Sequence, residues 1–316
     1  MLSPMESIAS TPDSPKNTKA LVALALGDNF QTAFERAFRP TWEVYAARHG
    51  YDIVVLTEPL DGSERAAARA PHWQKCLILE HERVRPYEHA VLVDADVSIN
   101  PQAAPCIVEA NGGSPHIGMI SWQESYRSTP AALDKREGRF HRAPSGHFWQ
   151  REDGDIPPTS ADYYARCGYD IDPGDWTNGG VLVMQPGLDE HRRIMRAIYE
   201  NHDEVPFSSV DNLAICVETI GKGAWNAIDP RFNLDLGLEL VANHPHVFQP
   251  GFKENKLALA TAIACCWLNA YFLHFVGSIR SFRPYALMIP QILLPAKNDR
   301  DALARLAAWG KTQGLL

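Results

Sequence analysis

Two acidic residues, Asp94 and Asp96, are separated by one position and follow an apolar run of the sequence. The run at 90–93 is continuously apolar, which is typical of a strand that is covered on both faces. At the carboxyl end of such a strand, two carboxylates place hard oxygen ligands on the edge of the sheet where ligands bind. The pattern therefore predicts a site at which a divalent cation joins these acids to a diphosphate.

The Asp-x-Asp pattern is a weak signal by itself, because so short a pattern has a high false-positive rate. This chain contains it again at 153–155, 170–172 and 299–301. Of the copies in this chain, only the pair Asp94 and Asp96 follows a strand-like run. At this point a simpler interpretation, in which both acids only cap the end of a strand, also stays open.

Alternating strand and helix patterns position these acids in the predicted fold. The predicted strands cover 19–26, 51–56, the run that ends at the two acids, 117–122, 181–184 and 272–276. The predicted helices cover 29–49, 71–81, 189–201, 211–219 and 299–312. This alternation predicts an α/β fold with a mostly parallel central sheet flanked by helices, whose ligands bind beyond the carboxyl ends of the strands.

The stretch 257–277 is apolar over roughly the length that a bilayer requires. Thr261, Asn269 and His274 interrupt it, and its composition changes from Ala-rich to aromatic. A buried helix at 256–266 and a buried strand at 270–276 are therefore favoured over a membrane span. Because the N-terminal stretch also lacks the features of a signal peptide, we expect a cytoplasmic protein.

The composition indicates a globular protein with one main domain. Its 316 residues are 45% hydrophobic and carry a net charge of -8, which argues against a nucleic-acid partner. Six cysteines without zinc-ligand spacing are typical of reduced core thiols. We expect a disordered tail at 1–18, a domain at 19–282 with an irregular lid-like insertion at 125–175, and a helical extension at 283–316.

Four ordered motifs resemble those of the retaining nucleotide-sugar glycosyltransferases of the GT-A fold, especially the glycogenin-like and lipopolysaccharide-galactosyltransferase-like group. The resemblance covers about residues 19–282. The motifs are WQK at 73–75, VDAD at 93–96, TNGGVL at 177–182 and HFVGSIR at 274–280. The resemblance implies a Rossmann-like GT-A domain, a nucleoside-diphosphate sugar as donor, and Mn²⁺ or Mg²⁺ as cofactor.

The last motif is implied to complete the metal and diphosphate site. In the family it reads His-x-x-Gly-x-x-Lys-Pro-Trp, and here His274, Gly277 and Arg280 keep the spacing, although Arg-Ser-Phe replaces Lys-Pro-Trp. His274 would complete the shell begun by the two acids, and its imidazole favours Mn²⁺ over Mg²⁺. Gly277 would let the backbone approach the diphosphate, and Arg280 would balance charge on the leaving group.

The resemblance also implies contacts to the donor sugar. Asn178 and Gly179 match an Asn-x-Gly that lines the sugar pocket, and Lys75 matches a basic residue near the sugar and diphosphate. Asp211 and Asn212 match an Asp-Gln pair whose Gln is implied to lie near the anomeric carbon, and Asn is one methylene shorter than Gln. Simpler interpretations stay open, namely a turn at Asn178, a solvated helix charge at Lys75 and a helix cap at Asp211.

At the end of the first strand, Asp28 is implied to contact the ribose or base, although an acid here also commonly caps the next helix. The resemblance implies transfer of a sugar to an acceptor hydroxyl with retention of configuration, and we expect a UDP-sugar rather than a GDP-sugar as the donor. A small molecule, a glycan and a protein are all possible acceptors, and we expect residues of the insertion at 125–175 to select the acceptor.

No residue identifies a covalent nucleophile, so double displacement and same-face attack both stay open.

Two other functions are compatible with an α/β nucleotide-binding fold. A sugar-phosphate nucleotidyltransferase would carry a Gly-rich basic loop after the first strand, and the sequence GDNFQTAFER at this position lacks one. A non-catalytic nucleotide-sugar binding protein is the other alternative. The complete set of proposed metal and phosphate residues argues against it.

Overall fold

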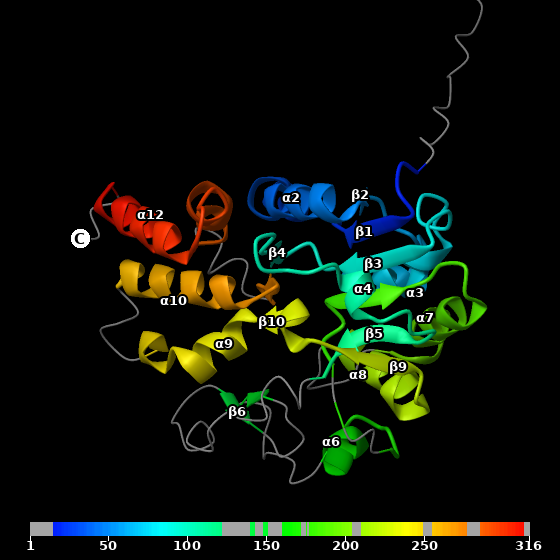
Figure 1. Cartoon of the computed structure of the whole chain (residues 1–316). Helices are drawn as coiled ribbons and strands as arrows, with labels where there is room; N and C mark the ends of the chain where they lie inside the picture. The colour runs from blue at the N-terminus through cyan, green and yellow to red at the C-terminus, as the bar shows by residue number, and fades with distance from the viewer. Residues whose placement is uncertain are drawn as a thin grey trace, which may run out of the picture.

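A mostly parallel sheet forms the centre of the protein (Figure 1). The computed structural model describes residues 15–121, 140–142, 148–150, 160–171, 175, 177–203, 210–248, 255–276 and 285–312. Within these residues the central sheet has six strands, in the order β2-β1-β3-β8-β5-β9. They are β1 (Lys19–Leu24), β2 (Tyr51–Leu56), β3 (His89–Val93), β5 (Ile117–Ile120), β8 (Val181–Met184) and β9 (Trp225–Ile228).

The strand directions agree with the predicted fold class. β1 is parallel to β2 and to β3, and β5 is parallel to β9, whereas β8 is antiparallel to both β3 and β5. All of β8 and nearly all of β3 are buried, as expected for strands that are covered on both faces. The predicted α/β fold with a mostly parallel central sheet flanked by helices is therefore confirmed.

The predicted helix at 29–49 is helical throughout but not regular. It consists of α1 (Asp28–Ala33), a π-helical turn η1 (Phe34–Phe38) and α2 (Arg39–His49). Pro40 has no amide hydrogen, so the regular bonding of the helix cannot continue through it, which accounts for the wider turn just before it. Trp42 of α2 is fully buried, and its indole N–H donates to the carbonyl oxygen of Val97 at 2.8 Å, which anchors the helix beside the turn that follows β3.

The other predicted helices of the first two thirds of the chain are also present. The segment predicted at 71–81 is a 3-10 helix, η2 (Pro71–Glu80), and it packs against α7 (Asp189–Asn201). The helix predicted at 211–219 is α8 (Val210–Glu218). Short helical elements are α3 (Glu64–Ala67), α4 (Ile107–Ala110), η5 (Ile220–Lys222) and η6 (Pro230–Asn233).

A smaller sheet lies beside the carboxyl end of β3. It is formed by β10 (Leu234–Asp235), β11 (Phe272–His274) and β4 (Val97–Ile99), with β11 in the middle. β11 is antiparallel to β4, and this register sets His274 opposite Val97. The last strand predicted from sequence therefore belongs to this sheet and not to the central one, and its register brings His274 next to the Asp94–Asp96 turn.

The C-terminal part of the described chain is mostly helical and lies on the side toward which β1, β3 and β5 point (Figure 1). It contains α9 (Leu236–Asn243), η7 (Pro245–Phe248), α10 (Lys256–Asn269), η8 (Ile289–Leu293) and α12 (Asp299–Thr312). In its described part, 257–276, the apolar stretch thus forms a helix followed by a strand, as predicted. Each helix in the described residues is too short or too polar to span a bilayer.

The insertion predicted at 125–175 contains some regular structure. β6 (Phe140–Arg142) and β7 (Phe148–Gln150) form an antiparallel pair, and α6 (Ser160–Arg166) follows them. α6 was not predicted from the sequence. The rest of this insertion, apart from 167–171 and 175, lies outside the described residues.

Candidate active site

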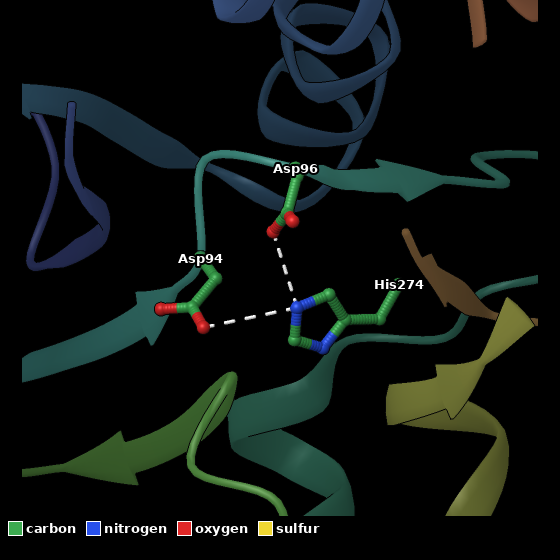
Figure 2. A group of neighbouring side chains, drawn as sticks. All are labelled: Asp94, Asp96 and His274. Carbon is green, nitrogen blue, oxygen red and sulfur yellow. Dashed lines mark ion pairs between the residues drawn. The ribbon is translucent and has the colours of Figure 1, made fainter. Parts of the chain in front are cut away.

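The three predicted metal ligands meet at the carboxyl end of β3 (Figure 2). Asp94 directly follows β3, Asp96 directly precedes β4, and His274 is the last residue of β11. Nε2 of His274 lies 3.1 Å from Oδ1 of Asp96 and 3.7 Å from Oδ2 of Asp94. One ligand atom from each residue lies within 4.8 Å of the others, so a single cation can contact all three.

Backbone hydrogen bonds hold this arrangement. The amide of Val97 donates to the carbonyl oxygen of Asp94 at 3.1 Å, which closes the turn between the two acids. The amide of Phe275 donates to the carbonyl oxygen of Asp96 at 3.0 Å, directly after His274. The turn and the end of β11 are thus tied to each other, which fixes the relative positions of the three side chains.

The charges of the cluster shift the pKa values of its members. Burial alone would lower the pKa of His274, but the carboxylate of Asp96, helped by Asp94 and Asp235, raises it above its usual value. For Asp96 the directions are reversed: burial alone would raise its pKa, but the nearby charges of His274 and Lys75 lower it. His274 and Asp96 therefore stabilise each other's charged forms.

We expect the affinity for Mn²⁺ to rise with pH. Because the raised pKa keeps a proton on His274, the cation must displace that proton from Nε2. Below the raised pKa, one displaced proton gives roughly a tenfold gain in affinity per pH unit, and above it the gain stops. Titration with Mn²⁺ at several pH values would show a flat profile if His274 is not a ligand, and the variant His274→Gln provides the flat reference.

The proton linkage has the opposite sign for the stability of the metal-free fold. Since the folded-state pKa of His274 is raised, its ion pair stabilises the fold fully below the usual histidine pKa. That contribution is lost as the pH rises through the raised value. A pH above the raised pKa of His274 thus favours cation binding, and at the same pH the ion pair of His274 no longer stabilises the metal-free fold.

Lys75 bonds both to Asp94, one of the three clustered residues, and to Gly179 in the loop between α6 and β8. Its side chain extends from η2, and Nζ lies 3.2 Å and 3.1 Å from the two carboxylate oxygens of Asp94 and 3.3 Å from the carbonyl oxygen of Gly179. Lys75 is 3% exposed. The interpretation of Lys75 as a solvated helix charge is therefore wrong, because the side chain is buried and paired with Asp94.

The predicted donor-sugar loop, 177–180, is held from several directions. Oδ1 of Asn178 accepts the amide of Gly180 at 2.8 Å, and the carbonyl of Gly180 accepts the amide of Asp94 at 2.8 Å. The amide of Gly179 donates to Oδ1 of Asn212 at 2.6 Å. Asn178, Gly179 and Asn212 are thus parts of one network that reaches Asp94, a predicted metal ligand.

The remaining predicted site residues have different positions. Asp28 is exposed in the first turn of α1, directly after the N-cap residue Gly27 and beyond the carboxyl end of β1. Asp211 lies in the first turn of α8, and its side chain is outside the described residues, as are Gly277 and Arg280. In the sequence, Gly277 directly follows the described segment 255–276, which contains His274, and Arg280 comes three residues later.

Sequence reasoning missed Asn233 and Asp235. Oδ1 of Asn233 lies 2.9 Å from Nδ1 of His274, and its Nδ2 donates to the carbonyl oxygen of Asn178 at 3.0 Å. Asp235 is buried beside His274 in the sheet register and caps α9, and burial raises its pKa. The available signal was the sequence RFNLDLGLEL, in which Asn233 and Asp235 alternate with apolar residues.

A separate surface depression of 760 Å³ lies beyond the end of β2. It contains none of the predicted site residues, and its charges are largely paired, since Arg196 bonds to Glu80 and Glu200. This depression therefore lies away from Asp94, Asp96 and His274. The convergence of ligand atoms is the stronger indicator of chemistry, because it requires three chain segments to place complementary groups together.

Comparison with solved structures finds glycosyltransferases. A glycosyltransferase involved in glycosylation of the major capsid of PBCV-1 is 15% identical, with a TM-score of 0.46 over 86% of this chain and 98% of the other. The galactosyltransferase LgtC, in complex with donor and acceptor sugar analogs, is 13% identical, with a TM-score of 0.41 over 84% and 95%. The bifunctional glycosyltransferase WbbM is 12% identical, with a TM-score of 0.44 over 83% and 46%.

No protein-family model and no curated protein sequence matches this chain. At these sequence identities and TM-scores, the similarity to the solved structures concerns the path of the backbone and assigns no role to a residue of this chain. The argument for function therefore rests on the residues of the site.

Proposed function

We propose that this protein is a metal-dependent glycosyltransferase, which moves a sugar from a nucleoside-diphosphate sugar to an acceptor hydroxyl with retention of configuration. The observation that carries the proposal is the convergence of Asp94, Asp96 and His274 at the carboxyl edge of the sheet. Residues from all four motifs that resemble this enzyme class meet there, since Lys75 and the loop at 177–180 border the cluster of Asp94, Asp96 and His274.

The donor set fits a divalent cation. Two carboxylates and one imidazole suit Mn²⁺, and Mg²⁺ less well, because Mg²⁺ prefers oxygen ligands. When bound, such a cation acts as a Lewis acid on the diphosphate of the donor and lowers the energy of the leaving group. The side chains of Asp94, Asp96 and His274 would hold it, and their positions are already set by the backbone bonds of the acid turn.

The surrounding residues are assigned to binding and charge compensation. Lys75 stabilises negative charge on the departing diphosphate, and we assign the same role to Arg280 and a close backbone approach to Gly277. Asn178 and Gly179 contact the donor sugar, and Asp28 contacts the ribose or base.

Asn212 supports this pocket because its side chain bonds the amide of Gly179. As the family resemblance implies, we place Asn212 near the anomeric carbon and assign Asp211 to the donor sugar or to catalysis. The donor is proposed to be a UDP-sugar, and the acceptor site is proposed to lie under the insertion at 125–175.

The proposal is tested with purified protein, Mn²⁺ and a panel of UDP- and GDP-sugars. We expect donor hydrolysis or transfer with at least one UDP-sugar, loss of this activity with a chelator, and its recovery with added Mn²⁺. Nucleotide binding by Asp96→Ala, measured in parallel by calorimetry, should be weaker than that of wild type. If no donor reacts and Asp96→Ala binds nucleotide as tightly as wild type, the proposed function is wrong.

A further inference from the structure

We propose that Asn233 is a positioning residue that sets the tautomer of His274 and couples the metal ligands to the donor-sugar loop. This inference rests on the metal site of the proposed function. Asn233 ends η6, directly before β10, and is 1% exposed, and His274 is 3% exposed. Neither side chain can exchange its partners with bulk water, so the hydrogen bonds between them decide which atoms carry protons.

The orientation of the Asn233 amide follows from backbone groups of fixed polarity. The amide of Gly180 can only donate, so the atom of Asn178 that it meets at 2.8 Å is Oδ1. The carbonyl of Asn178 can only accept, so the atom of Asn233 that meets it at 3.0 Å is Nδ2. The other end of the Asn233 amide, which faces His274, is therefore Oδ1.

This orientation determines the neutral form of the imidazole. Oδ1 of Asn233 accepts at 2.9 Å, so Nδ1 of His274 must carry a hydrogen. The lone pair of the neutral ring then lies on Nε2, the atom that faces Asp96 at 3.1 Å and Asp94 at 3.7 Å. The opposite tautomer would direct an N–H group at the cation and remove the nitrogen ligand.

The same amide reaches the donor-sugar loop. Nδ2 of Asn233 lies 3.0 Å from the carbonyl oxygen and 3.3 Å from Oδ1 of Asn178. The side chain of Asn233 thus accepts a hydrogen bond from His274, the proposed metal ligand, and donates one to Asn178, which we assign to the donor sugar. Replacing Asn233 separates these two tasks, because aspartate can still accept from Nδ1 but cannot donate to Asn178, whereas leucine can do neither.

The experiment measures Mn²⁺ affinity of the full chain by electron paramagnetic resonance, with the ¹⁴N coupling of bound Mn²⁺ as a spectroscopic readout of His274. For Asn233→Leu we expect about a 10- to 100-fold loss of affinity and loss of the ¹⁴N coupling. For Asn233→Asp we expect Mn²⁺ affinity within about threefold of wild type with the coupling retained, but a raised KM for the donor sugar with little change in the affinity for the nucleoside diphosphate alone.

Asn111→Leu is the matched control, because Asn111 is also a buried amide with side-chain partners but contacts none of the metal ligands. It should bind Mn²⁺ as wild type does. If folded Asn233→Leu keeps full affinity and coupling, or if Asn233→Asp loses affinity as strongly as a metal-ligand variant, the assignment of Asn233 is overturned.

If Asn233→Leu does not fold, the Mn²⁺ affinity, the ¹⁴N coupling and the donor KM of Asn233→Asp decide whether the assignment of Asn233 holds. If wild type binds no Mn²⁺, or binds it no better than Asp96→Asn, the proposed function fails, a result distinct from failure of the Asn233 assignment.

Discussion

Asp96→Asn should reduce Mn²⁺-dependent sugar transfer on the order of 10³-fold in kcat/KM. Asp96 is one of the three clustered residues that we propose as metal ligands, and its Oδ1 faces Nε2 of His274 at 3.1 Å. Asparagine keeps the volume but removes the charge, so both the electrostatic attraction of the cation and the partner of the imidazolium are lost. Steady-state kinetics at saturating Mn²⁺ and a Mn²⁺ titration of the same protein measure the two effects.

A second Asp-x-Asp pair provides the matched control for this substitution. Asp299 is exposed in the first turn of α12, so Asp299→Asn changes the same chemical group away from the metal cluster. We expect no more than about a twofold change in kcat/KM for Asp299→Asn. If Asp96→Asn keeps more than about a tenth of the wild-type activity with unchanged Mn²⁺ affinity, Asp96 is not a ligand.

The central part of the site was predictable from sequence because its residues follow local patterns. Asp94 and Asp96 come after a continuous apolar run, and a buried strand that ends in acids places them at an edge of the sheet. His274 was predictable only through the spacing of a motif, since nothing local distinguishes a ligand from a core histidine. Its meeting with the acids depends on the register of β11 against β4.

Strand direction and short strands were not predictable in the same way. The apolar sequence VLVM of β8 is the same signal for a parallel and an antiparallel strand, and only pairing with β3 and β5 determines its direction. β10 has two residues, too few for any periodicity to appear. For this reason the polar residues of RFNLDLGLEL could be noticed in the sequence, but their position could not be predicted, including the contact of Asn233 with His274.

Two interpretations of the loop at 177–180 turn out to be compatible. Gly179 and Gly180 do form a turn directly before β8, as an Asn-Gly pair predicts. The same turn is bonded to Asp94 and lies beside Lys75, so it also belongs to the candidate site. A turn signal is therefore no argument against a binding role when the turn lies at the carboxyl edge of the sheet.

The packing at Gly180 leads to the second large expected effect. A Cβ atom at this position would overlap the ring of His274 and lie 2.8 Å from Oδ1 of Asn178. The backbone of Gly180 cannot easily withdraw, because its amide and its carbonyl are both hydrogen-bonded, to Asn178 and to Asp94. In Gly180→Ala the imidazole therefore has to move away from Asn233 and from the acids.

For Gly180→Ala we expect the free energy of unfolding to fall by about 1–3 kcal/mol, the Mn²⁺ affinity by at least about tenfold and the transfer rate by about 100-fold. Gly187→Ala, at the other end of β8, is the matched control. A Cβ atom there meets nothing within 4 Å, so stability should be unchanged or rise by up to about 1 kcal/mol.

Urea unfolding and Mn²⁺ titration of the two variants measure these quantities together. A Gly180→Ala protein with wild-type affinity would mean that the imidazole can move without loss of the cation, in which case His274 packs beside the site and the acids hold the metal without it.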